Sequence, residues 1–299
     1  MQNNNHHTEE NMIEIKKLNE LHVEELSTYL NNYQETTMFI RNNLYYSGIN
    51  YQDAPFHGEY YGSFENHQLN GTLVHYWNGN IMMQAENFSI LSALVDEFKL
   101  NRIRPIAGVL GEDSQASFVI DKLDLQSPSL FAVNYQEKLF LLNLEKMMMP
   151  ETIHTYDCAI KSVQDCQIDV IKEWLVAYHI EALGEDVNNP KLEESIINEI
   201  QDKQLSQNRW VLFVNNTPVS LCGFNAHLPD IVQLGPVYTP LSLRNKGFAR
   251  TVVSLCLKQA AMNQVKRAIL FTNENSAIRA YKSLGFQEIG KYRLALFRK

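Results

Sequence analysis

The feature that most constrains the fold of this 299-residue chain is an apolar segment that runs into a basic, glycine-containing loop and then into a helix. Apolar and β-branched residues over 231–239 predict a strand. A helical pattern follows over residues 245–262, and the loop reads Arg-x-x-Gly-x-Ala from Arg244 to Ala249. Helices and strands therefore mix within one domain, which predicts an α+β fold with a mixed sheet.

The loop has the chemistry of an anion-binding site. The first amides of a helix lack intrahelical acceptors and point at an anion, and the helix dipole adds positive potential. Gly247 lets the main chain approach phosphate oxygens, and Arg244 and Lys246 can add charged donors. The order Lys246-Gly247-Phe248 excludes the Gly-Lys-Ser/Thr nucleotide loop. Taken alone, the motif is more typical of an exposed loop with a tight turn.

A second motif changes this interpretation. After a predicted strand at 267–272, the sequence Asn-x-Ala-Ile-x-x-Tyr-x-x-Leu-Gly-Phe runs from Asn275 to Phe286 and predicts a helix and a closing strand. The strand end, the loop and this helix resemble the GNAT acyltransferase superfamily in order and spacing. The resemblance is specific over residues 231–297 and weaker over 153–225. The first half resembles the degenerate leading domain of two-domain members.

The resemblance implies an acetyl-CoA co-substrate and no metal. The strand before the loop would splay from its neighbour and pair with pantetheine, and Pro236, which has no N–H, would favour the splay. The loop amides would hold the pyrophosphate. Asn275 would contact the pantetheine arm, with Asn273 as a competitor. The cofactor-binding residues predicted in this way are Val237, Tyr238, Thr239, Arg244, Asn245, Lys246, Gly247, Phe248, Ala249 and Asn275.

Tyr281 takes the position of the family's general acid. A phenol stays protonated at pH 7 and can protonate a departing thiolate. The alternative is a tyrosine that only packs its ring against the cofactor helix. An acceptor amine must also lose a proton, and position alone offers several bases, each of which is more typically a solvated side chain: His179, Glu181, Glu185, Asp186, His227 and Asp230.

The two halves differ in charge but share an order of elements. The formal net charge of −8 divides into −10 for residues 1–150 (9 Lys+Arg, 19 Asp+Glu) and +2 for residues 151–299 (17 and 15). Each half predicts helix, three-strand meander, helix, strand, helix, strand, which indicates duplication. We expect a disordered tip at 1–11, a degenerate GNAT-like domain at 12–146, a linker at 147–152 and the catalytic domain at 153–299.

Turn signals organise the first half. Asn70-Gly71 and Asn78-Gly79 predict hairpins between strands at 59–64, 71–77 and 80–84. A helix at 89–98 would begin at Ser89 as N-cap, and residues 103–110 predict a strand. Gly108 to Gly111 falls where a second anion loop is expected, but it lacks a basic residue and precedes Glu112-Asp113. We therefore expect this half to bind no coenzyme A.

Composition narrows the function further. A pI near 5.6 and the absence of a nucleic-acid motif argue against a DNA or RNA partner. The sequence has no apolar run long enough to predict a membrane span. Its four cysteines form no recognisable pair, which favours a cytoplasmic protein. It also has no coiled-coil heptad from which an oligomeric state could be predicted. We expect an N-acetyltransferase that uses direct attack by a primary amine of a small molecule or peptide. The alternatives are a catalytically weak coenzyme A-binding regulatory module, or a protein acetyltransferase whose acidic first half recruits a cationic partner.

Overall fold

The computed structural model describes residues 13–298, and the predicted tip at 1–11 lies outside them. The chain divides into two compact units. Unit 1 comprises the residues up to Leu130 together with the chain end from Leu296, and unit 2 comprises Phe131–Ala295. The mixed α+β fold predicted from the sequence is confirmed, and the domain boundaries at 147–152 stay a prediction. Within residues 13–298, no helix is long and apolar enough to cross a membrane.

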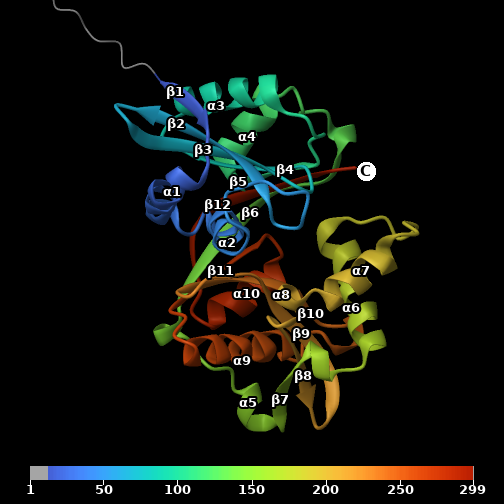
Figure 1. The fold of residues 1–299 in the computed structure, drawn as a ribbon. Helices are drawn as coiled ribbons and strands as arrows, with labels where there is room; N and C mark the ends of the chain where they lie inside the picture. The colour runs from blue at the N-terminus through green and yellow to red at the C-terminus, as the bar shows by residue number, and fades with distance from the viewer. Residues whose placement is uncertain (1–12, 299) are drawn as a thin grey trace, which may run out of the picture. The chain divides into compact units, whose positions relative to one another are not determined.

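Unit 1 is a five-stranded sheet in the order β1-β2-β3-β4-β5. Helices α3 and α4 cover one face, and α1 and α2 lie on the other (Figure 1). All strand pairs are antiparallel except β4 with β5. The elements are β1 (Glu14–Lys17), α1 (Val23–Leu30), α2 (Met38–Ser47), β2 (Gly58–Glu65), β3 (Gln68–Tyr76), β4 (Asn80–Ala85), α3 (Phe88–Asn101), β5 (Gly108–Glu112) and α4 (Asp113–Lys122).

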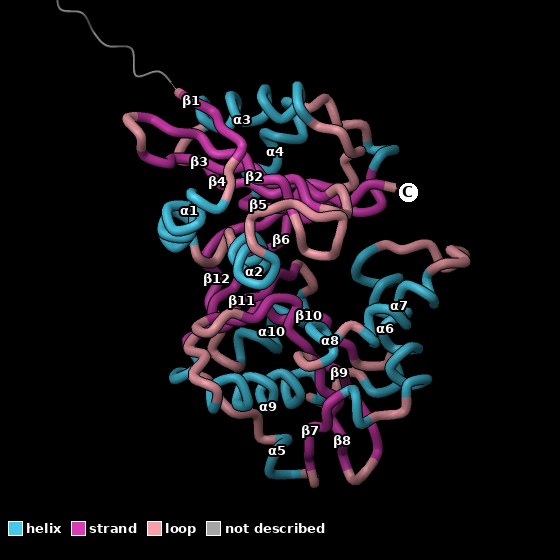
Figure 2. Tube along the Cα trace, in the orientation of Figure 1, coloured by secondary structure: helices cyan, strands magenta, loops and turns pink. Residues whose placement is uncertain are grey.

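Unit 2 repeats this arrangement with seven strands in the order β12-β6-β11-β10-β9-β8-β7 (Figure 2). Strand β6, which precedes the predicted linker, pairs antiparallel with β11. The elements are β6 (Phe131–Asn143), α5 (Thr152–Thr155), β7 (Cys158–Ser162), α6 (Ile168–Leu183), α7 (Leu192–Gln201), α8 (Lys203–Ser206), β8 (Arg209–Val214), β9 (Thr217–His227), β10 (Ile231–Tyr238), α9 (Phe248–Met262), β11 (Arg267–Thr272), α10 (Asn275–Ser283) and β12 (Gln287–Phe297).

The sheet of unit 2 is covered by helices on both faces, and successive side chains of a strand enter the two cores in turn. Leu212 and Cys222 pack into the core beneath α9 and α10. Their neighbours Val211 and Leu221 pack into a second core beneath α6 and α7. The site therefore stands on a sheet that is held from both sides.

Three local predictions in unit 1 are wrong. The first hairpin turns at Asn66-His67, where both residues have positive φ, and Gly71 lies inside β3. Helix α3 begins at Phe88 with Asn87 as its cap, because the Asn87 side chain accepts a hydrogen bond from the Ile90 amide at 2.9 Å. The strand predicted at 103–110 is β5 at Gly108–Glu112, so Gly108–Gly111 is part of a strand and not a loop, and the loop equivalent to 244–249 is the short connection between β4 and α3.

At that connection, several main-chain groups have side-chain partners within unit 1. Strands β4 and β5 pair over three residues and then diverge, as β10 and β11 do. In unit 1, however, side chains occupy the main-chain groups near the end of β4. The Gln115 side chain accepts from the Ala85 amide at 2.8 Å, and the Tyr29 hydroxyl donates to the Gln84 carbonyl at 3.3 Å. That unit 1 binds no coenzyme A stays a prediction.

The role of Gly71 can be tested by stability. A Cβ at this position would lie 2.6 Å from Ile90 Cγ2 and 3.1 Å from Leu94 Cδ1, so β3 and α3 must separate to accept it. We expect Gly71→Ala to lower the free energy of unfolding by about 1–3 kcal/mol. Gly290→Ala, where no atom lies within 4 Å of the new methyl, should change it by less than about 0.5 kcal/mol. Equal effects of the two variants in denaturant titrations would contradict this packing account.

Candidate active site

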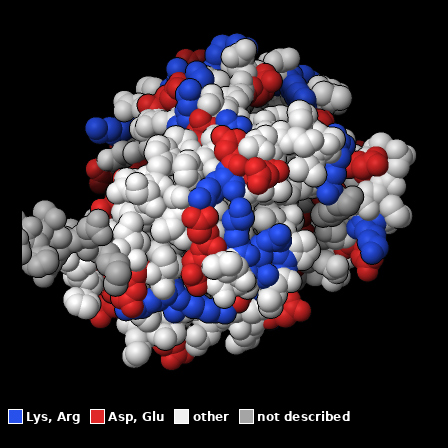
Figure 3. Space-filling view, turned by 90° about the horizontal axis from the view of Figure 1, so that it is seen from above, with Lys and Arg blue, Asp and Glu red and all other residues white. Residues whose placement is uncertain are grey.

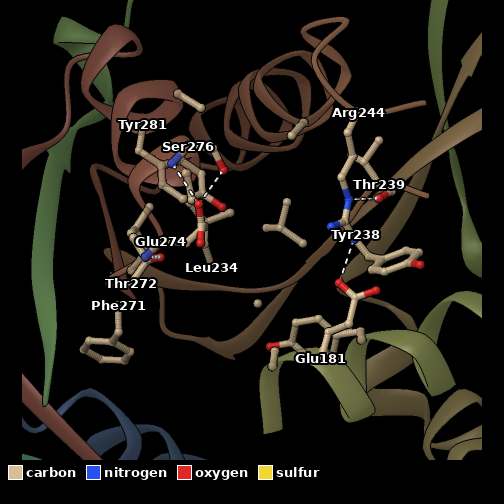
Figure 4. A pocket seen from close by; sticks show the side chains of 18 of the residues that line it. Glu181, Leu234, Tyr238, Thr239, Arg244, Phe271, Thr272, Glu274, Ser276 and Tyr281 are labelled. Carbon is tan, nitrogen blue, oxygen red and sulfur yellow. Dashed lines mark hydrogen bonds and ion pairs between the residues drawn. The ribbon is translucent and has the colours of Figure 1, made fainter. Parts of the chain in front are cut away.

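A cavity of about 1200 Å³ opens in unit 2 where β10 and β11 diverge. Figure 4 shows Tyr281, Ser276 and Glu274 on one side of it and Arg244, Tyr238 and Glu181 on the other. Asn273 lines the cavity, whereas Lys246 and Asn275 are not part of its lining. The predicted site residues that the cavity brings together are Val237, Tyr238, Thr239, Arg244, Asn245, Gly247, Phe248, Ala249 and Tyr281.

The opening results from how β10 is paired. Its parallel register with β11 covers only Ile231–Gln233. Beyond that point β10 stays with β9 through two register shifts between Gln233 and Val237, where Gly235-Pro236 interrupts the ladder. The last residues of β10 therefore have a neighbouring strand on one side and the cavity on the other, which is the splay that the family resemblance implied.

Helix α9 begins at Phe248 and not at Asn245 as predicted. Asn245 and Gly247 have φ values of +64° and +83°. These values are left-handed, so a right-handed helix cannot begin before Phe248. The Thr251 amide donates to the Gly247 carbonyl at 3.1 Å, so the amides of the first helical residues precede the hydrogen-bond ladder. A Cβ on Gly247 would lie 2.8 Å from Thr152 Oγ1, so this position also needs glycine for space.

Arginines supply positive charge around this helix start. Arg244 donates from Nε to the Thr239 carbonyl at 2.9 Å and pairs through Nη2 with Glu181 at 2.7 Å. Arg250 and Arg279 also line the cavity, and the sequence analysis missed both. Arg250 lies three residues after Gly247, so helical periodicity alone could have placed it beside the loop.

The neighbouring helix start, that of α10, is already occupied. The Glu274 carboxylate accepts from the Ser276 amide at 3.1 Å and from its hydroxyl at 3.0 Å. These hydrogen bonds lower the pKa of Glu274, so the group is a carboxylate at neutral pH. A second anion would be repelled there. The Asn273 side chain donates to the Gln136 carbonyl and is therefore held at the end of β11.

Tyr281 projects from α10 into the cavity wall and packs against Phe286, with ring centroids 5.8 Å apart. Burial raises the pKa of Tyr281, and the neighbouring Cys222 and Tyr178 act in the same direction. The phenol is therefore protonated throughout the physiological range and can act as a proton donor.

The structure separates the six candidate bases. Only Glu181 among them lines the cavity, and it is paired with Arg244. The other five make contacts elsewhere: His179 with Glu199, His227 with Asn208, Asp230 with Arg267, Glu185 with Asn189 and Asp186 with Asn188.

A further carboxylate, that of Glu137 on β6, lines the cavity, and burial raises its pKa to about 7. The sequence does not predict it as a site residue, because its strand lies before the predicted catalytic domain. No local motif marks it, and only the pairing of β6 with β11 brings it to the cavity.

A charged cluster fixes α6, which carries Tyr178 and Glu181, against the sheet. Glu199 of α7 pairs with His179 at 3.0 Å and with Arg209 at 2.5 Å. The Arg209 side chain is 2% exposed. Burial opposes ionisation of Glu199, but the hydrogen bonds and charges of His179 and Arg209 outweigh it and hold its pKa below the ordinary value.

Comparison with known proteins assigns this part of the chain to a family. Residues 168–286 match the acetyltransferase (GNAT) family, across the divergent strands, the loop and the α10 motif. This part of the chain belongs to the GNAT acetyltransferase family. The family implies an acyl-CoA co-substrate and an amine acceptor. No curated protein matches this sequence closely enough to count as a relative.

Solved structures support the fold of the whole chain. A GCN5-related N-acetyltransferase from Sphaerobacter thermophilus is 10% identical, with 95% of this chain and 94% of that chain covered and a TM-score of 0.55. A tandem GNAT protein from the clavulanic acid biosynthesis pathway is 8% identical, with 96% and 98% covered and a TM-score of 0.55. A putative acetyltransferase from Pyrococcus horikoshii is 12% identical, with 98% and 94% covered and a TM-score of 0.52.

The cluster behind α6 generates a stability prediction. Glu199→Gln leaves the buried Arg209 without its anion, and we expect the free energy of unfolding to fall by about 3 kcal/mol at pH 7. Because the hydrogen bonds and charges of His179 and Arg209 lower the folded-state pKa of Glu199, this contribution should be present at neutral pH and disappear as the pH falls through that lowered pKa. The matched control is Glu193→Gln on the same helix, whose pair with Lys172 is exposed, and it should cost less than about 1 kcal/mol. Equal losses in the two variants would show that the cluster does not anchor α6.

Proposed function

We propose that this protein is an acetyl-CoA-dependent N-acetyltransferase that transfers the acetyl group to a primary amine by direct attack in a ternary complex. The observation that carries the proposal is a single cavity in unit 2. It joins the start of α9, the free side of β10 and a buried, protonated tyrosine. These three parts match the three needs of the reaction, which are a diphosphate site, an extended surface for pantetheine and a proton donor for sulfur.

Binding of the co-substrate would use main-chain groups first. The amides of residues 245–249 would hold the pyrophosphate at the start of α9, with Arg244, Arg250 and Arg279 adding charge. The free side of β10, at Val237 to Thr239, would pair with the pantetheine arm. Asn273 is better placed than Asn275 to contact that arm, because it lies in the cavity lining.

Chemistry would occur beside the end of β10. The main-chain amide of Val237 or Tyr238 would polarise the thioester carbonyl, and this interaction strengthens as negative charge develops on the oxygen. The amine nitrogen attacks the carbonyl carbon, the C–N bond forms and the C–S bond breaks. Tyr281 donates its phenolic proton to the departing sulfur.

The two alternative functions are less well supported. A coenzyme A-binding module without catalysis needs no buried proton donor beside the cavity, yet Tyr281 is one. A protein acetyltransferase that recruits a cationic partner needs an acidic surface. The face in Figure 3 carries acidic and basic side chains interspersed.

The proposal is tested with the purified full chain. Calorimetry measures the affinity for acetyl-CoA, and release of free thiol measures transfer to a panel of small amines, amino acids, aminoglycosides, polyamines and peptide N-termini. We expect binding and amine-dependent thiol release. Binding with no release for any amine would support the regulatory module, and no binding would overturn the proposal.

Tyr281→Phe separates chemistry from binding. The variant keeps the ring and removes the proton donor, so we expect turnover to fall at least about tenfold while the affinity for acetyl-CoA stays within about twofold. Tyr45→Phe, at an exposed residue of α2 in unit 1, is the control and should leave both unchanged. Parallel losses of turnover and affinity in Tyr281→Phe would instead assign the tyrosine a structural role.

A further inference from the structure

In the part of the chain that the structure describes, three carboxylates line the cavity, those of Glu137, Glu181 and Glu274. Two of them have partners, since Glu181 pairs with Arg244 and Glu274 accepts hydrogen bonds from Ser276. Within residues 13–298, no cation or hydrogen-bond donor pairs with the Glu137 side chain. An ionisable group that is half-buried and unpaired at a cavity wall is costly to keep, which points to a functional role.

Strand geometry places Glu137 on the acceptor side of the sheet. In β6, Phe140 and Leu142 point into the core beneath α9 and α10. Glu137 has the opposite parity, so it points to the face covered by α6. The register of β6 with β11 pairs Lys138 with Thr272, which puts Glu137 beside the end of β11 where the cavity opens. The phosphate-binding helix and Glu137 therefore lie on opposite faces of the diverging strands.

The titratable groups of the cavity leave Glu137 as a base near neutral pH. Tyr178 and Glu181 of α6, Tyr135 of β6 and Tyr281 of α10 line the same cavity, and Tyr178 lies close enough to interact with the Glu137 charge. Arg209 and Glu199 lie behind Tyr178, and both influence the pKa of that tyrosine, as Glu137 does. Burial is the resolved cause of the shift of Glu137, and the resulting pKa of about 7 suits a group that must accept a proton at pH 7–8.

We propose that Glu137, carried by the strand that precedes the predicted catalytic domain, is the general base that deprotonates the acceptor amine. This rests on the proposed function of the same cavity. During attack, one N–H proton passes from the amine to the Glu137 carboxylate, the C–N bond forms, and the C–S electron pair leaves on sulfur, which takes the Tyr281 proton. The proton on Glu137 then returns through solvent to the Tyr281 phenolate, so the enzyme is restored.

The assignment also defines the acceptor end of the cavity. A primary amine that arrives as an ammonium ion is attracted by ionised Glu137, and it releases its first proton to solvent before the attack, so that Glu137 stays ionised to accept the second. Tyr135 and Tyr178 border the same space with aromatic rings. An acceptor whose amine is carried on a short apolar or aromatic group fits this lining. The active site is then incomplete without β6, although every residue of the family motif lies after it.

Glu137→Gln in the full chain tests the proposal, with an amine that the wild-type protein acetylates. We expect kcat to fall at least about 100-fold at pH 7.5, because general bases contribute 10²–10⁴-fold, with acetyl-CoA affinity within about twofold. In the wild type, kcat/KM should fall about tenfold per pH unit below pH 7, since the base must be ionised. Glu137→Gln should lose this limb, and Glu137→Asp should keep it with partial activity.

A matched control and a stability readout keep the outcomes distinct. Glu288→Gln on β12, whose carboxylate pairs with Lys138, should leave kcat and the pH profile unchanged. Because burial raises the folded-state pKa of Glu137 from 4.5 to about 7, the fold loses stability as the pH rises between these two values, and the loss is complete at pH 8, where Glu137→Gln should therefore melt at a higher temperature than the wild type.

Each contrary result has a separate meaning. An active wild type with an equally active Glu137→Gln, or a variant altered only in KM, overturns the base assignment and leaves the proposed function standing. A wild-type protein that acetylates no amine overturns the proposed function, and the role of Glu137 falls with it.

Discussion

The site depends on one departure from regular sheet pairing. Strand β10 leaves β11 after Gln233, and helix α9 begins just beyond its end with amides that precede the helical ladder. Main-chain donors and acceptors that lack partners inside the protein are costly unless water or a ligand satisfies them. The divergence thus creates a demand for a polar, extended ligand, and the diphosphate and amide groups of coenzyme A can meet it.

The two units show the same divergence with opposite outcomes. In unit 1, Gln115 and Tyr29 satisfy the main chain near the end of β4, and Asn87 caps α3 directly. In unit 2 the corresponding helix has no side-chain cap, and its first residue follows a left-handed glycine. A duplicated fold can therefore keep the same strand order while a few side chains decide whether the gap is filled from within or left for a ligand.

The sequence predicted those parts of the site that local chemistry determines. The strand, the loop with Gly247 and the helix with Tyr281 follow one another closely in sequence, so propensity and periodicity predicted the elements, and the resemblance to the GNAT superfamily implied their roles. The position of Glu137 and the pairing of Arg244 with Glu181 depend on contacts between distant segments, and no local pattern encodes them. The turn of the first hairpin was predicted wrongly for a related reason. Asn70-Gly71 is a strong local turn signal, but Gly71 lies in β3, where its lack of a side chain lets β3 pack against α3.

The most direct test of the central claim is amide hydrogen exchange of the full chain with and without coenzyme A. If main-chain donors at the start of α9 hold the diphosphate, exchange should slow over residues 245–251 on binding, with no change over residues 86–90, where unit 1 has its own caps. Saturating coenzyme A that leaves 245–251 unprotected, or that protects 86–90 instead, would contradict the account.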